Sequence, residues 1–170
     1  VVGEPTGMQP AVCEKGLLVL DCSTHGKSGH AARNEGINAL YKATETIEAL
    51  RTFEFPLASD LLGKVKLTVT QIQAGTQHNV IPARCDFVVD VRTNDRYTNA
   101  EAVEILKSRF PEVKIAPRSL RLNSSAISMQ HPFVRRALLA GYKPFGSPTL
   151  SDQALMPFPS VKMGPGDSSR

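Results

Sequence analysis

Four polar residues stand at positions from which they could take part in chemistry. His30 lies in the segment STHGKSGHAARNEG (residues 23–36), where small neighbours leave its imidazole free to project. Glu4 stands between a glycine and a proline in GEPTG, and a carboxylate at such a strand end could bind a cation such as zinc. Arg92 ends an alternating segment and could clamp a carboxylate with two hydrogen bonds. Asn79, in HNVIP, is the fourth candidate.

Each of these residues also has a purely structural explanation. His30 could cap or flank the helix that follows it, and Glu4 could be an exposed acid in a loop. Arg92 could be a solvated strand arginine. Asn79 could be a simple turn residue, because asparagine tolerates the backbone geometry of turns. The residues by themselves leave these alternatives open.

Hydrophobic periodicity indicates the elements that must position the four residues. Residues 15–24 are apolar and bounded by turn residues, which predicts a strand. From Ile37 to Leu50 the apolar residues recur at spacings of three and four, which predicts one face of a helix. Residues 64–72 and 83–92 alternate, which predicts two strands with one face on a core and one polar face.

A second helix and a last strand complete this pattern. Thr98 and Glu101 have the spacing of a capping box, which opens a helix that runs to Phe110, and residues 112–117 predict a strand. The order strand, helix, strand, strand, helix, strand predicts an α+β fold over residues 14–118. This fold is the ferredoxin-like split βαβ unit, a four-stranded antiparallel sheet with two helices on one face.

The remaining segments have no place in the split βαβ unit. Residues 131–143 predict a further helix with Pro132 in its first turn, and residues 159–170 predict a short strand that runs into a loop. We interpret residues 1–13 and 119–170 as parts of a second domain that the split βαβ unit interrupts. The chain begins without methionine and stops in a loop-like stretch, so we expect it to be a fragment of a larger protein.

Composition limits the classes of partner. Hydrophobic residues make up 41% and charged residues 21%, as in soluble globular proteins. No apolar run approaches the roughly 18 residues that cross a bilayer, and the basic residues are scattered with no tryptophan to stack on bases. We therefore expect neither a membrane nor a nucleic acid as partner. The odd set of Cys13, Cys22 and Cys85 lacks metal-type spacing, which predicts free thiols in a reducing, cytoplasmic location.

Four motifs, in order along nearly the whole chain, resemble the M20 family of metallopeptidases and deacylases. They are VVGEPTG, GKSGHAA, HNVIPARCDFVVDVR and GPGD. The resemblance implies that residues 1–13 and 119–170 belong to an α/β catalytic domain that holds two zinc ions in the full-length enzyme. It implies that residues 14–118 form a lid domain that makes a homodimer. The other metal ligands and the general base would lie outside this sequence.

The resemblance also implies roles for single residues. Glu4 would be a zinc ligand, and His30 would be catalytic, reaching across the dimer to stabilise the oxyanion in the partner's active site. Asn79 would bind substrate or support the lid hinge, and Arg92 would bind substrate. Asp167 of GPGD would orient a metal-binding histidine beyond the end of the chain.

The TLSDQALM segment departs from the family pattern. Ser151 and Asp152 match it, whereas Thr149 and Leu150 stand where a glycine and a threonine are expected. This departure predicts a different preference for the acyl group or the amino acid.

The function implied is that of a zinc-dependent amide hydrolase that deacylates N-acyl amino acids. Small molecules of the acetylornithine or acyl-citrulline type, as in arginine biosynthesis, would be the substrates. The alternative within the family is a dipeptidase or aminopeptidase. The alternative in another class is a dimerisation module, and we expect the isolated fragment to bind no zinc and to be inactive.

Overall fold

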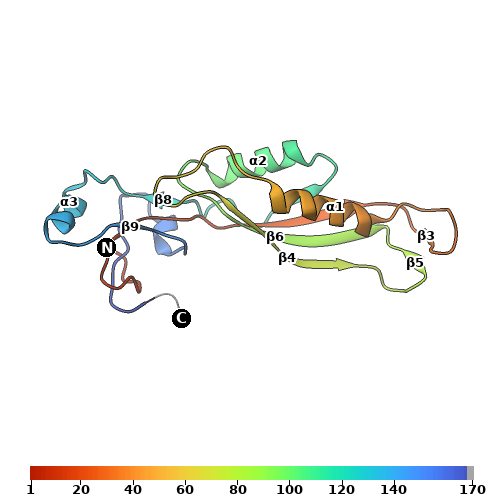
Figure 1. Ribbon diagram of the computed structural model, residues 1–170, viewed down its shortest axis with the longest axis horizontal. Coiled ribbons are helices and arrows are strands. Elements are labelled where there is room, and N and C mark those ends of the chain that lie inside the picture. The colour runs from red at the N-terminus through yellow and green to blue at the C-terminus, as the bar shows by residue number, and fades with distance from the viewer. Residues whose placement is uncertain (168–170) are drawn as a thin grey trace.

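The computed structural model describes residues 1–167, which form a four-stranded sheet, a three-stranded sheet and a two-stranded ribbon (Figure 1). Two connections join the four-stranded and the three-stranded sheets. The larger sheet has four antiparallel strands in the order β4-β6-β2-β7. Its strands are β2 (Leu18–His25), β4 (Lys66–Ala74), β6 (Arg84–Arg92) and β7 (Lys114–Pro117). Helices α1 (Ala39–Thr52) and α2 (Asn99–Arg109) cover one face of it. This arrangement, which we call the four-stranded unit, confirms the predicted α+β split βαβ fold.

The second sheet has three short strands in the order β8-β1-β9 and is called the three-stranded sheet below. They are β1 (Ala11–Glu14), β8 (Ser125–Ala126) and β9 (Phe145–Ser147). Helix α3 (Pro132–Leu139) and the short 3-10 helix η1 (Asp152–Leu155) lie at the same end of the molecule (Figure 1). A two-stranded ribbon of β3 (Gly29–His30) and β5 (Val80–Ile81) extends the opposite end.

The core of the four-stranded unit follows the predicted alternation. Leu18, Leu20, Phe87, Val89 and Val91 are all at most 2% exposed and face the two helices. Burying one such side chain contributes about 1.5–3 kcal/mol, so this layer holds the helices on the sheet. Helix α2 begins where the sequence predicts its cap, whereas the cap of α1 was not predicted. Both halves of the Thr98–Glu101 capping box are formed, and Asn38 accepts the Leu40 N–H at the start of α1.

Two predictions about strands were wrong in detail. The alternation over residues 64–72 breaks at a bulge between Val69 and Gln71, after which Ile72 pairs with Phe87 on the helix side. A bulge inserts one unpaired residue and so reverses the faces of all that follow. The expected strand after residue 159 is reduced to isolated bridges from Lys162 to Val2 and to Ala11.

The cysteines are free and buried, as the sequence predicts. Burial raises the pKa of Cys13 to about 11 and that of Cys22 to about 12. Because the thiolate is the reactive form, both thiols are inert in the folded chain near neutral pH. Among residues 1–167, no helix is long and apolar enough to cross a membrane.

Candidate functional site

The GEPTG and GPGD motifs, at opposite ends of the sequence, lie side by side. Thr6 ties them together: its hydroxyl donates to the Gly164 carbonyl at 3.3 Å and accepts the Gly164 N–H at 3.1 Å. The Gly7 N–H donates to the Gly166 carbonyl at 2.6 Å. Gly164 has no room for a side chain, because a Cβ there would lie 2.6 Å from the Glu4 carbonyl oxygen. The loop of Glu4 is therefore held rigidly against the loop that leads to Asp167.

The Glu4 side chain is not engaged by the residues around it. It is half-buried and forms no hydrogen bond or ion pair with the residues that the structure describes. Catalytic zinc sites use about three protein ligands. Within residues 1–167, no group of three His, Cys, Asp or Glu side chains is placed to hold a metal ion. The described chain can thus supply one carboxylate to a metal site but cannot complete the site.

His30 projects from the β3–β5 ribbon with one ring nitrogen committed and the other available. It is exposed, and its Nδ1 accepts the Ala32 N–H at 3.2 Å. A nitrogen that accepts a hydrogen bond carries no proton, so in the neutral ring the proton is on Nε2. The imidazole can therefore present an Nε2–H donor outward, which is what stabilisation of an oxyanion requires.

The loop that carries His30 is rigid. Lys27 and Ile37 exchange two backbone hydrogen bonds of 2.9 and 2.8 Å, which close the loop at its base. The Glu35 carboxylate accepts the His30 N–H at 3.2 Å. A Cβ at Gly29 would lie 2.7 Å from the Glu35 carbonyl oxygen, so this position needs glycine. The small residues around His30 serve this close backbone packing, which holds the exposed imidazole in place.

The structure brings Asn79 to His30 but keeps Arg92 apart from both. The Asn79 carbonyl accepts the Ala31 N–H at 2.9 Å, beside the pairing of His30 with Val80. Arg92 ends β6 eight residues after Arg84, about 27 Å away at 3.4 Å per residue. Its guanidinium donates to Asp90 through Nε at 2.7 Å and through a terminal nitrogen at 3.1 Å.

Ser151 points into a buried polar cluster that sequence reasoning missed. Glu14, which is fully buried, accepts the Ser151 hydroxyl at 2.7 Å and pairs with Lys162 at 3.4 Å. The Lys162 ammonium also donates to the Thr149 carbonyl at 3.0 Å. The available signal was a charged residue inside each of two apolar stretches, AVCE and PSVKM. The cluster joins β1 to the segment that runs into the GPGD loop.

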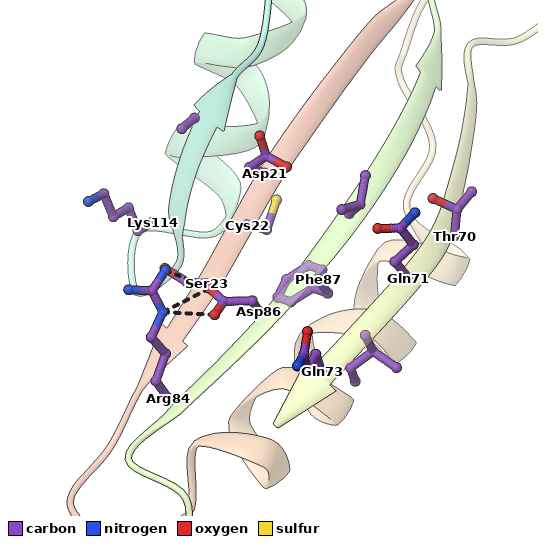
Figure 2. Close-up of a pocket in the computed structure, with 13 residues that line it drawn as sticks. Asp21, Cys22, Ser23, Thr70, Gln71, Gln73, Arg84, Asp86, Phe87 and Lys114 are labelled. Atoms are coloured by element: carbon purple, nitrogen blue, oxygen red, sulfur yellow. Dashed lines mark hydrogen bonds and ion pairs between the residues drawn. The ribbon is translucent and has the colours of Figure 1, made fainter. Parts of the chain in front are cut away.

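The uncovered face of the four-stranded sheet contains an open hollow of about 770 Å³ (Figure 2). Its lining combines short side chains such as Ser23 and Ala116 with the longer side chains of Gln71, Gln73 and Arg84. Arg84 is paired with Asp86 at 2.8 Å, and across the face Arg118 is paired with Asp21 at 2.8 Å. None of the four predicted site residues lines this hollow.

Glu4 and His30 lie at opposite ends of the elongated chain. The β3–β5 ribbon extends one end of the four-stranded unit, while the N-terminal loop and the three-stranded sheet occupy the other (Figure 1). The Leu18–His25 strand alone spans about 24 Å between them. One chain therefore cannot bring His30 and Glu4 to the same reacting group.

Comparisons with known proteins agree with this arrangement. The family model of the M20 peptidase dimerisation domain matches residues 12–116, more than half of the chain. An acetylornithine deacetylase of Myxococcus xanthus is 31% identical over 99 residues, which are 54% of this chain and 26% of that protein. A LysW-lysine/LysW-ornithine hydrolase of Aeropyrum pernix is 30% identical over 156 residues, 86% of this chain and 39% of that protein.

Solved structures show the same fold. The aminopeptidase PepT of Bacillus cereus matches with a TM-score of 0.70 at 13% identity, over 96% of this chain and 47% of that one. A tripeptidase of Staphylococcus aureus matches with a TM-score of 0.70 at 15% identity, over 96% of this chain and 46% of that one. The chain thus spans less than half the length of these relatives. It belongs to the M20 peptidase family and contains the dimerisation domain of that family.

Proposed function

We propose that the chain is part of a zinc-dependent amide hydrolase that removes the acyl group from an N-acyl amino acid. The observation that carries this proposal is the separation of Glu4 from His30, each at a rigid site that is incomplete by itself. A homodimer would bring the two residues together, because the His30 ribbon of one subunit could reach the Glu4 site of the other. The domain division proposed is a lid of residues 14–118 and a catalytic part formed by residues 1–13 and 119–170.

Each residue then has a definite task. Glu4 would hold zinc, which when bound would polarise the amide carbonyl and activate water. His30 would donate its Nε2–H to the carbonyl oxygen as that oxygen gains charge. Asn79 would contact the substrate beside His30, since it lies far from the connections between the two sheets. Arg92 already pairs with Asp90, so it would bind a substrate carboxylate only by sharing its guanidinium.

The relatives support deacylation of amino-acid derivatives, because an acetylornithine deacetylase and several succinyl-diaminopimelate desuccinylases are among them. The second candidate is a peptidase, favoured by the likeness of fold to an aminopeptidase and a tripeptidase. The whole protein, assayed on acetylornithine, on succinyl-diaminopimelate and on dipeptides, separates them. Hydrolysis of the dipeptides, with neither acyl amino acid hydrolysed, would show that the protein is a peptidase and not a deacylase.

A cytoplasmic location remains a prediction.

The 170-residue chain by itself is expected to bind no stoichiometric zinc and to hydrolyse none of these substrates. The physical reason is that residues 1–167 place no two further ligands with Glu4, whereas a catalytic zinc ion needs about three. Metal analysis after dialysis of the untagged chain against zinc checks this. One zinc ion per chain, lost on Glu4→Ala, would show that the chain completes a site after all.

We propose that the homodimer forms through β4 and α1. The sheet has two edges, β4 and β7. β7 has four residues and ends in Pro117, which lacks an N–H, whereas β4 has nine residues. Beside β4, a hollow of about 300 Å³ against α1 is lined by Ile47, Leu67 and Val69, among others. A long edge with apolar side chains next to it invites pairing with another strand. Two copies would then join into one larger sheet around a two-fold axis.

Ile72→Lys is expected to convert the dimer to a monomer. Ile72 is half exposed on β4, so a lysine there costs little in the monomer but places two charges at the proposed seam. The matched control is Leu139→Lys, which changes an 85% exposed leucine on α3, away from β4. Light scattering or sedimentation of the purified chains measures the mass. A chain that is monomeric without substitution, or a dimer unaffected by Ile72→Lys, would contradict this interface and weaken the role of His30 across it.

A further inference from the structure

Two connections cross between the three-stranded sheet and the four-stranded unit, and they are hydrogen-bonded to each other. The first crossing is residues 15–17, and the second is residues 118–124. The Leu17 N–H donates to the Leu122 carbonyl at 2.9 Å, and the Ser124 hydroxyl donates to the Glu14 carbonyl at 2.7 Å. The orientation of the four-stranded unit relative to the three-stranded sheet therefore depends on the contacts that hold these two crossings.

Asn99, the first residue of α2, holds both crossings at once. It is fully buried, and its side-chain amide nitrogen donates to the Leu17 carbonyl at 3.1 Å and to the Leu122 carbonyl at 2.9 Å. Its side-chain oxygen accepts the Thr93 hydroxyl at 2.8 Å. Its backbone N–H donates to the Asn123 side chain at 2.7 Å. Helix α2 is thereby tied to the two crossings by one side chain whose amide hydrogens are both used.

Packing at the first crossing is equally tight. The Gly16 N–H donates to the Thr93 carbonyl at 3.0 Å. A Cβ at Gly16 would meet the Thr93 hydroxyl and would lie 2.7 Å from the Ser124 nitrogen and 2.9 Å from the Leu122 oxygen. Gly16 is thus packed directly against Thr93 and against the second crossing, with no room for a side chain between them.

We propose that Asn99 is a positioning residue that fixes the orientation of the four-stranded unit relative to the three-stranded sheet. A small rotation at the junction would displace His30 by a large distance, because His30 lies beyond the far end of β2. A rotation of about 10° at the junction moves a point 24 Å away by about 4 Å, more than a productive hydrogen bond tolerates. The consequence for His30 rests on the proposed function, whereas the orientation itself does not.

The test compares Asn99→Asp with Thr98→Ala in the 170-residue chain. Aspartate keeps the shape of asparagine, but its carboxylate cannot donate to the Leu17 and Leu122 carbonyls. Thr98→Ala removes the capping box of the same helix and leaves both crossings their partners. Thr98→Ala is therefore the control: it shows how far the measurements change when α2 is weakened but its bonds to the two crossings remain.

Two measurements report on the stability of the crossings and on the orientation of the two parts. The first is amide hydrogen exchange of Gly16 and Leu17 relative to Val89 in the sheet centre. The second is the distance distribution between spin labels on Glu45→Cys of α1 and Arg135→Cys of α3. Both label sites are exposed, while the three native thiols are buried and their pKa values are raised. Neither measurement depends on catalysis, so failure of the hydrolase assignment leaves this test intact.

Asn99→Asp is expected to speed exchange at Gly16 and Leu17 by about 10- to 100-fold, with Val89 unchanged, because the Leu17 and Leu122 carbonyls lose the bonds from the Asn99 amide that hold the two crossings to α2. The spin-label distances broaden in the same variant and stay narrow in Thr98→Ala. Narrow distances in Asn99→Asp, or equal broadening in Thr98→Ala, would overturn the proposal. The orientation would then rest on other contacts, such as that of the Lys15 ammonium with the Lys64 carbonyl at 2.8 Å. If Asn99→Asp does not fold, Asn99→Ala, which removes the same two donors without adding a charge, takes the same test with the same two outcomes.

Discussion

Replacing His30 by alanine in the whole enzyme is expected to lower kcat about 100- to 1000-fold while KM changes little. The reason is that the outward Nε2–H of His30 meets the substrate oxygen mainly when that oxygen carries negative charge. The matched control is His25→Ala, which changes an exposed histidine at the end of β2 without disturbing the His30 loop. Steady-state kinetics of both variants measures the effect, and an unchanged kcat would return His30 to a structural role.

Mixing two inactive variants tests whether His30 acts across the dimer. Chains with His30→Ala retain Glu4, and chains with Glu4→Ala retain His30. If subunits exchange freely in an equal mixture, half of the dimers are mixed and each has one complete site, so about a quarter of the activity returns. Activity that stays at the level of the separate variants would mean that both residues serve a site in the same chain.

The second large effect is expected at the buried ion pair of Glu14 and Lys162. Lys162→Met should destabilise the three-stranded sheet by about 3–5 kcal/mol, because it leaves the Glu14 carboxylate buried without a counter-charge. Among residues 1–167, Glu14 Oε1 has no hydrogen-bond partner, so the neutral Ser151 hydroxyl on Oε2 would be left to hold the charge. The matched control is Lys64→Met in the exposed pair with Glu54, which should change stability by less than about 1 kcal/mol.

Removing both charges should recover most of this loss. The double variant Glu14→Met with Lys162→Met replaces the pair by apolar side chains of similar length, which is often neutral. The Cys13 thiol, buried in β1 beside Glu14, reports on this sheet through its reaction with a thiol reagent during denaturant unfolding. Equal destabilisation in the single and the double variant would show that the pair acts through packing and not through charge.

The larger fold could be predicted because its signals are local. The Ile37–Leu50 periodicity, the Thr98–Glu101 capping box and the alternation of residues 83–92 each depend on neighbours a few positions away. The bulge in β4 could not be predicted, since it is set by the pairing of Val69 and Gln71 with β6. Strands β1 and β8, with four and two residues, carry too little pattern to be recognised in the sequence and depend on their pairing with each other and with β9.

The candidate site divides in the same way. The sequence by itself predicted Glu4 and His30 as the residues that carry the chemistry, from their residue types and the glycines next to them, and that remains a prediction. Only the tertiary structure decided how they are placed: the Glu4 loop against the GPGD loop, and His30 at the far end of the sheet. The ion pair of Glu14 with Lys162 was likewise hidden, because hydrogen bonds and charge pairs between distant segments leave no periodicity in the sequence.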